Sequence, residues 1–349
     1  MAGFDVEEVK RLLGLPAHVR IPALVAIGRG DAVKEAGMAA DERWTEAAGG
    51  PGETGYGIPP QGYRLPVGIR LGRVSLQVAD LDRSLGYYQE VIGLRVLDRS
   101  DGSAALGAHG DDTVLVELHE RPGAAPAPHR GRLGLYHFAI LLPDRAALGR
   151  LVSHLAEIGA QAGASDHLVS EALYLQDPDG LGIEVYADRP RATWRYEGRQ
   201  LKMDTRPLDV ASLAHSAGGE PWTGAPSGTV IGHIHLHVGN LDEAAAFYHR
   251  ALGLDQVVWS YPGALFLSAG GYHHHLGLNT WAGPGAERPR DGDARLLEWT
   301  MVVPGAGDAD AAARSVEAAG YEVSGTEQGW TCADPWGTVL RLASSGDGR

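Results

Sequence analysis

The sequence predicts an α+β fold built from four copies of a unit that contains one strand, one helix and further strands. The stretches from Leu71, LGRVSLQVADLDRSLGYYQEVIGL, and from Ile231, IGHIHLHVGNLDEAAAFYHRALGL, match nearly position for position. In each, apolar and other residues first alternate, as in a half-buried strand, and the apolar residues then recur at helical spacing. Two weaker copies begin near Leu135 and Leu296, and both run into an Asp-Pro-x-Gly turn and a short final segment.

The helix boundaries inside the two strong copies follow from single residues. Asp80 and Asn240 come directly after the predicted opening strands, where a side chain that can cap a helix is expected. Apolar residues then recur at helical spacing. Gly93 and Gly253 stand where each helix should end, because glycine adopts the left-handed conformation that often closes a helix.

Composition and charge restrict the class of protein. A chain of 349 residues with 44% apolar and 21% charged residues has the composition of a globular protein and enough length for two domains. The net charge of −14 argues against nucleic acid or an anionic membrane as partner. Cys332 is the single cysteine, which excludes an intrachain disulfide and favours a cytoplasmic location. No apolar run is long enough for a membrane span.

The spacing of the four units predicts the domain organisation. Aligning their opening strands places Arg73, His137, His233 and Glu298 in register, and the middle interval is the longest. Its extra length matches a polar, irregular segment. We therefore predict an N-terminal extension, a first domain of two units, a linker and a second domain of two units, at residues 1–66, 67–190, 191–228 and 229–349.

The repeated units, from about Leu71 to Ala343, resemble the vicinal oxygen chelate superfamily of glyoxalases, bleomycin-resistance proteins and extradiol dioxygenases. The resemblance implies four βαβββ units paired into two vicinal-oxygen-chelate domains with concave mixed sheets that cup a metal. The extension lies outside this resemblance. Its segment FDVEEVKRLLGLPAHVRIPALVAIGRGD resembles the C-terminal tail of nitroreductase-type flavoproteins, and the stretch after it is expected to be flexible.

The middle two units carry residues suited to a metal. In such a unit the first and last strands lie side by side, so that a residue from each can face one ion. These positions are His137 and Glu184 in the second unit, and His233 and Asn279 in the third. Two imidazoles and one carboxylate leave about three open positions on an octahedral ion, as in non-haem Fe(II) oxygenases. We expect Fe(II) as the cofactor, preferred over Mn(II), with Asn279 a poor ligand.

The outer two units carry the wrong charges for a cation. Arg73 occupies the opening position of the first unit, with Val116 or Glu117 at the closing position, and Glu298 and Arg341 occupy those of the fourth. We expect an ion pair that fills an abandoned site. The middle units should therefore face each other across one cup, and the outer units across the other.

The segment SDHLVSEALYLQDPDGLGIEVYADRP, from Ser165 to Pro190, is closely similar to extradiol enzymes of the Bacillus-type catechol 2,3-dioxygenase subgroup. The resemblance implies that His167 and Tyr174 hydrogen-bond the substrate. The third unit's HHHLGLN resembles the paired histidines of that subgroup, which places an acid–base residue at His274.

The histidine run leaves one ambiguity. Strict alternation from Asn279 would turn His273 and His275, rather than His274, to the cup, unless a turn or bulge after Gly271 reverses the parity. The imidazoles that do not face the cup are expected to be solvated.

Further candidates for the pocket are residues that lie close in the sequence to the predicted site residues. His235 shares a strand face with His233 and is expected to line the pocket or support the ligands. The side chains of Trp259, Trp281 and Phe266 are candidates for the wall.

The resemblance implies an Fe(II)-dependent extradiol dioxygenase that cleaves catechol or a substituted catechol with O2. The expected partners are a small aromatic diol and O2, with no nucleic acid and no membrane, and a homo-oligomer is left open. Two alternatives stand beside it. One is a glyoxalase-like lyase, isomerase or thiol transferase that uses Zn, Ni or Mn, and the other is a metal-free binding protein of the bleomycin-resistance type.

Overall fold

The computed structural model describes residues 56–345. Residues 1–55, which include the nitroreductase-like segment, and residues 346–349 lie outside the described part of the chain. Within that part, none of the helices has both the length and the apolar character needed to cross a lipid bilayer.

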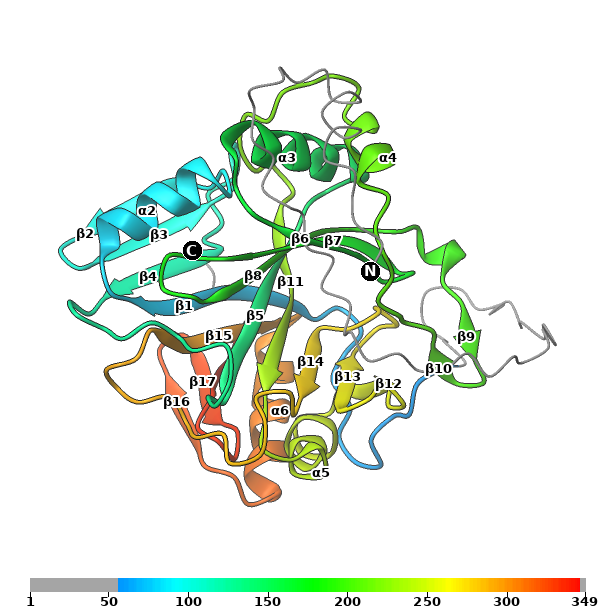
Figure 1. The fold of residues 1–349 in the computed structure, drawn as a ribbon. Coiled ribbons are helices and arrows are strands. Elements are labelled where there is room, and N and C mark those ends of the chain that lie inside the picture. The colour runs from blue at the N-terminus through cyan, green and yellow to red at the C-terminus, as the bar shows by residue number, and fades with distance from the viewer. Residues whose placement is uncertain (1–55, 346–349) are drawn as a thin grey trace.

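Four successive βαβββ units form the fold, as the repeats predict (Figure 1). The first unit contains β1 (Arg70–Val78), α2 (Leu81–Glu90), β2 (Arg95–Ser100), β3 (Ser103–Gly107) and β4 (Val116–Glu120). The second contains β5 (Gly134–Leu141), α3 (Arg145–Ile158), β6 (Gly163–Asp166), β7 (Ser170–Gln176) and β8 (Gly182–Asp188). The third contains β11 (Val230–His237), α5 (Leu241–Ala244) continued by the π-helical turn η2 (Ala245–Ala251), β12 (Asp255–Val258), β13 (Ala264–Ser268) and β14 (Leu276–Asn279). The fourth contains β15 (Arg295–Val303), α6 (Ala306–Ala318), β16 (Val323–Thr326), β17 (Gly329–Ala333) and β18 (Val339–Ser344).

The segment between the second and third units has short elements of its own. They are the 3₁₀ turn η1 (Arg191–Thr193), β9 (Tyr196–Glu197), β10 (Gln200–Leu201) and α4 (Val210–His215). Leu201 and Leu213 of this segment are fully buried. The predicted linker therefore packs on the units that it joins.

Two mixed eight-stranded sheets arise from pairing between the halves of the chain. The middle-unit sheet has the order β12-β13-β14-β11-β5-β8-β7-β6, and the outer-unit sheet has the order β16-β17-β18-β15-β1-β4-β3-β2. At the centre of each, two opening strands run antiparallel, β5 beside β11 and β1 beside β15. In Figure 1 the sheets lie across one another near the middle of the molecule. The predicted pairing of middle with middle and outer with outer units is confirmed.

The predicted helix caps are present. The side chain of Asp80 accepts a hydrogen bond from the backbone N–H of Arg83, and Asn240 accepts from the first turn of α5. Gly93 and Gly253 have φ of +82° and +98°, the left-handed conformation that glycine adopts without a steric cost. Local sequence therefore fixes where these helices begin and end.

Two buried tyrosines join the sheets. Tyr88 of α2 donates a hydrogen bond of 3.3 Å to Asp177, in the Asp-Pro-x-Gly turn of the second unit. Tyr248 of η2 donates one of 3.0 Å to Asp334 in the matching turn of the fourth unit. Each bond connects a helix of one sheet to a turn of the other, across the apolar core around Trp299.

The described end of the predicted extension packs against the third unit. Arg64 binds both carboxylate oxygens of Asp255, at 2.8 and 2.6 Å. The Tyr56 hydroxyl donates to the carbonyl oxygen of Gly271, two residues before the histidine run. Leu65 is buried in the main core.

Candidate metal centre

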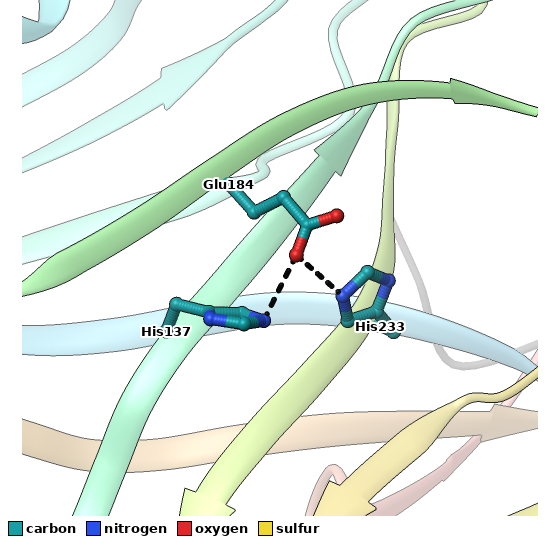
Figure 2. A group of neighbouring side chains, drawn as sticks. All are labelled: His137, Glu184 and His233. Atoms are coloured by element: carbon teal, nitrogen blue, oxygen red, sulfur yellow. Dashed lines mark hydrogen bonds and ion pairs between the residues drawn. The ribbon is translucent and has the colours of Figure 1, made fainter. Parts of the chain in front are cut away.

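Three side chains meet on the middle-unit sheet: His137 from β5, Glu184 from β8 and His233 from β11 (Figure 2). The Glu184 Oε2 atom lies 3.0 Å from Nε2 of His137 and 3.2 Å from Nε2 of His233. All three side chains are buried, and one ligand atom from each lies within 4.8 Å of the others. The structure thus brings together the three residues that the repeat positions selected as metal ligands.

Sheet topology explains this meeting. β5 lies between β8, which runs parallel to it, and β11, which runs antiparallel. Ala139 pairs with Glu184 on one side, and His137 pairs with His235 on the other. Because side chains two residues apart on a strand share a face, the three candidate ligands project from one surface of the sheet.

The electrostatics favour the ligand forms of Glu184 and His233. Burial alone would raise the pKa of Glu184, but the imidazoles of His233 and His137 hold that pKa well below its usual range. Burial lowers the pKa of His233 to about 4, although the Glu184 carboxylate opposes the shift. A neutral imidazole and an ionised carboxylate are the forms that bind a metal without first losing a proton.

The donor set fits a divalent transition metal. Nε2 of His137 is buried and finds no hydrogen-bond partner among the described residues, although the Glu184 oxygen is only 3.0 Å away. A buried nitrogen without a hydrogen bond costs free energy unless something else binds it. Imidazole nitrogens with one carboxylate suit Fe(II), Zn(II) and related ions.

The prediction that Asn279 is the closing residue of the third unit is wrong. Strand register places Gly277 of β14, not Asn279, opposite His235, where a closing residue should stand. A Cβ at Gly277 would lie 2.8 Å from the His235 ring, so that ring occupies the space of a fourth ligand. Asn279 lies two residues further along and contacts Nδ1 of His237 at 2.6 Å. The alignment of the repeats therefore selected a residue two positions too far along β14.

The histidine run precedes its strand. β14 begins at Leu276, and Gly270 and Gly271 both have positive φ, so strict alternation does not extend back into the run. The expectation that some of these imidazoles are solvated is wrong, because the exposed fractions of His273, His274 and His275 are 0%, 6% and 7%. The turn folds the run inward and buries all three rings.

The three imidazoles have different neighbours. The ring of His274 lies beside that of the candidate ligand His233, with ring centroids 4.1 Å apart and the planes tilted by 47°. His273 contacts Asp188 at 2.8 Å through Nε2, and His275 contacts Ser268 at 3.1 Å. His274 is thus the member of the run whose ring lies nearest to the metal centre.

His167 and Tyr174 form a pair beside the centre. Nε2 of His167 lies 2.6 Å from the Tyr174 hydroxyl, and Nδ1 lies 2.8 Å from the carbonyl oxygen of Asp204. Because a carbonyl only accepts, Nδ1 carries the proton, and the Tyr174 hydroxyl donates to Nε2. The Tyr174 ring lies 5.6 Å from that of His137. Leu168, directly after His167, has a strained φ of +70°.

Aromatic rings surround His235 next to the centre. The rings of Phe266 and Trp281 lie 5.6 and 5.5 Å from His235, as the sequence predicted for wall residues. Trp259, the third candidate, is 38% exposed. Tyr136 was missed by sequence reasoning, yet its ring lies 4.9 Å from that of His137.

A β-bulge explains the position of Tyr136. Simple alternation would turn it away from the face of His137. The β5–β11 register shifts between His235 and Leu236, whose partners are His137 and Leu135, so Tyr136 is the extra residue. Such an extra residue bends the strand and redirects its side chain.

The outer-unit sheet carries ion pairs at the matching positions. Arg73 lies 2.9 Å from Glu117, and Arg341 binds both carboxylate oxygens of Glu298 at 2.7 and 2.8 Å. Each arginine neutralises one glutamate. The expectation of paired charges in this second cup is confirmed, with Glu117 rather than Val116 at the closing position.

Fold and centre together define a class. Residues 70–185 and 230–342 match the Glyoxalase/Bleomycin resistance protein/Dioxygenase superfamily. The chain belongs to this superfamily.

Within it, the chain is 48% identical to the catechol-2,3-dioxygenase of Bacillus subtilis over 269 residues, which cover 76% of this chain and 93% of that enzyme. A lactoylglutathione lyase of Haemophilus influenzae is 30% identical over 122 residues, covering 33% of this chain and 89% of the lyase. A solved Bacillus subtilis structure, provisionally described as a dioxygenase, superposes with a TM-score of 0.58 at 15% identity and covers 81% of this chain and 86% of its own. That superposition supports the fold.

Proposed function

We propose that the chain is an Fe(II)-dependent extradiol dioxygenase that opens the ring of catechol, or of a catechol with a small substituent, with O2. The observation that carries the proposal is the buried group of His137, Glu184 and His233, assembled from two units of the chain. The similarity to a catechol-2,3-dioxygenase along most of the chain supports it.

The three candidate ligands would hold Fe(II) and leave room for other ligands. The ion, when bound, supplies Lewis acidity toward the vicinal oxygens of the diol and the redox chemistry with O2. Gly277 has no side chain, so β14 supplies no fourth ligand at this position. A glyoxalase-type centre with four side-chain ligands is therefore disfavoured.

His274 would move the proton of a substrate hydroxyl. Burial, and next the neighbouring His233 and His273, hold the pKa of His274 well below its usual value. The ring is therefore neutral at pH 7 and has one nitrogen lone pair that can accept a proton. Its ring centroid lies 4.1 Å from that of the candidate ligand His233, which places the ring beside the candidate metal centre.

Tyr174 and His167 would orient the diol. Burial, and next the charge of Glu184, hold the pKa of Tyr174 well above its usual value, so the phenol stays protonated. Its proton points to His167, which leaves the oxygen lone pairs to accept a hydrogen bond from a substrate hydroxyl. The pair thus favours one orientation of the bound ring.

The wall favours an uncharged aromatic substrate. Phe266, Trp281 and Tyr136 present ring surfaces around His235 and His137. Aromatic rings pack in offset or edge-to-face contacts, and a flat diol can join such a set. A substrate with no charged substituent suits this wall.

A direct assay tests the proposal. The full-length protein, loaded anaerobically with Fe(II), is given catechol and then air, and O2 uptake is measured with the absorbance of the product. We expect equimolar O2 consumption and a yellow ring-opened semialdehyde. Thiol-dependent turnover with Zn, Ni or Mn and without O2 uptake would instead assign the glyoxalase-like or thiol-transferase alternative. A protein that binds no metal would instead be a binding module of the bleomycin-resistance type.

A further inference from the structure

A row of two hydrogen bonds connects Asp188, at the end of β8, to His274. Oδ1 of Asp188 lies 2.8 Å from Nε2 of His273. Nδ1 of His273 lies 2.7 Å from Nδ1 of His274. His273 is completely buried, whereas 28% of the Asp188 side chain is exposed.

The chemistry of the row determines which atoms carry protons. The Asp188 carboxylate only accepts, so Nε2 of His273 must donate to it. A neutral His273 then has a lone pair at Nδ1. The contact of 2.7 Å therefore requires a proton on Nδ1 of His274, which leaves Nε2 of His274 as the nitrogen with the lone pair.

The position of Asp188 is itself determined by neighbours. Its Oδ1 also accepts from the Tyr272 hydroxyl at 3.3 Å, and Tyr272 contacts the Tyr186 hydroxyl at 2.6 Å. The Trp194 ring lies 5.4 Å from the His273 ring. These contacts limit the rotation of both Asp188 and His273.

We propose that Asp188 and His273 are positioning residues that set the orientation and tautomer of His274, so that its Nε2 is the proton acceptor in the reaction. The inference rests on the proposed function, because a substrate hydroxyl supplies that proton. A matched comparison lies in the same run. Nδ1 of His275 accepts from the backbone N–H of Ala269 at 3.3 Å and lies 3.1 Å from the Ser268 hydroxyl, so its surroundings need no carboxylate and removal of that hydroxyl leaves its tautomer unchanged.

Kinetics of matched variants test the proposal. Asp188→Asn keeps the shape of the side chain but removes its charge and adds an N–H donor, so the wrong tautomer of His273 becomes accessible. We expect kcat for catechol to fall about 10- to 100-fold with KM changed by less than about threefold, since a misplaced base affects proton transfer more than binding. Asp188→Glu should recover most of the loss. Ser268→Ala, the control, should keep kcat within about twofold of the wild type.

Nitrogen NMR supplies a readout that does not need turnover. In the full-length protein loaded with diamagnetic Zn(II) and labelled with ¹⁵N-histidine, His274 should give the pattern of a protonated Nδ1, with the signal assigned by its loss in His274→Gln. Asp188→Asn should shift His274 toward protonation at Nε2. A wild-type His274 protonated at Nε2 would overturn the proposal, as would an Asp188→Asn enzyme with the kcat of Ser268→Ala. Absence of catechol cleavage by the wild type refutes the proposed function alone, because the spectra still decide the tautomer.

Discussion

At the scale of single residues, the candidate metal centre depends on one carboxylate. Glu184 is the sole acidic member of the described group and contacts both imidazoles. A carboxylate supplies negative charge that an amide oxygen lacks, and the ion needs that charge in a buried site.

The substitution Glu184→Gln should therefore lower affinity for divalent metal by about 100-fold or more while the fold is retained. Metal content after dialysis and titration with Fe(II) or Zn(II) measure the effect. Glu117→Gln, at the closing position of the other cup, is the matched control and should bind metal like the wild type. Equal loss in both variants would contradict the assignment of the centre.

A glycine next to the centre is required by close packing. A Cβ at Gly232 would lie 1.9 Å from the hydroxyl oxygen of the buried Tyr186. That hydroxyl is hydrogen-bonded to the hydroxyl of Tyr272. Gly232→Ala should therefore displace Tyr186 and reduce the free energy of unfolding by about 1–3 kcal/mol. Chemical denaturation measures this. Gly86→Ala on α2, where no heavy atom lies within 4 Å of the new Cβ, should be neutral or stabilising.

At the scale of elements, the Asp-Pro-x-Gly turns connect helices to the opposite sheet. Asp177 accepts hydrogen bonds from Tyr88 and from the backbone N–H groups of Asp179 and Leu181. Burial raises the pKa of Asp177 to about 6, more than these hydrogen bonds lower it. The folded chain thus keeps the proton to higher pH than the unfolded chain.

This shift predicts a pH dependence of stability. Between about pH 4 and pH 6 the folded state binds more protons at Asp177 than the unfolded state, so the free energy of unfolding falls as the pH rises. The contribution is about 2–3 kcal/mol across that window. Denaturation of wild type and Asp177→Asn from pH 4 to pH 7 should show the smaller decrease in the variant. An equal decrease in both would show that Asp177 titrates normally in the folded protein.

At the scale of the whole molecule, each sheet combines units from both halves of the chain. The two cups are therefore separate in composition: one collects the candidate ligands, and the other collects two arginine–glutamate pairs. Changes in the second cup should affect stability without affecting metal binding.

The substitution Arg341→Ala tests this separation. It leaves the mostly buried Glu298 without its bidentate partner, which should cost about 1–3 kcal/mol of stability. Metal content should stay at the wild-type level. Calorimetric or denaturant unfolding and metal analysis on the same sample measure both effects. Loss of metal with Arg341→Ala would show that the two cups are coupled.

Local sequence was sufficient for the repeated units and for helix ends such as Asp80 and Gly93, because caps and periodicity act within a few residues. It also selected His137, Glu184 and His233, because repeats place equivalent residues at equivalent positions. Only the tertiary structure decided three features: the bulge at Tyr136, the position of Gly277 rather than Asn279 as the closing residue, and the burial of the histidine run. Register and bulges depend on hydrogen bonds between strands distant in sequence, and a one-residue shift there turns a side chain to the other face.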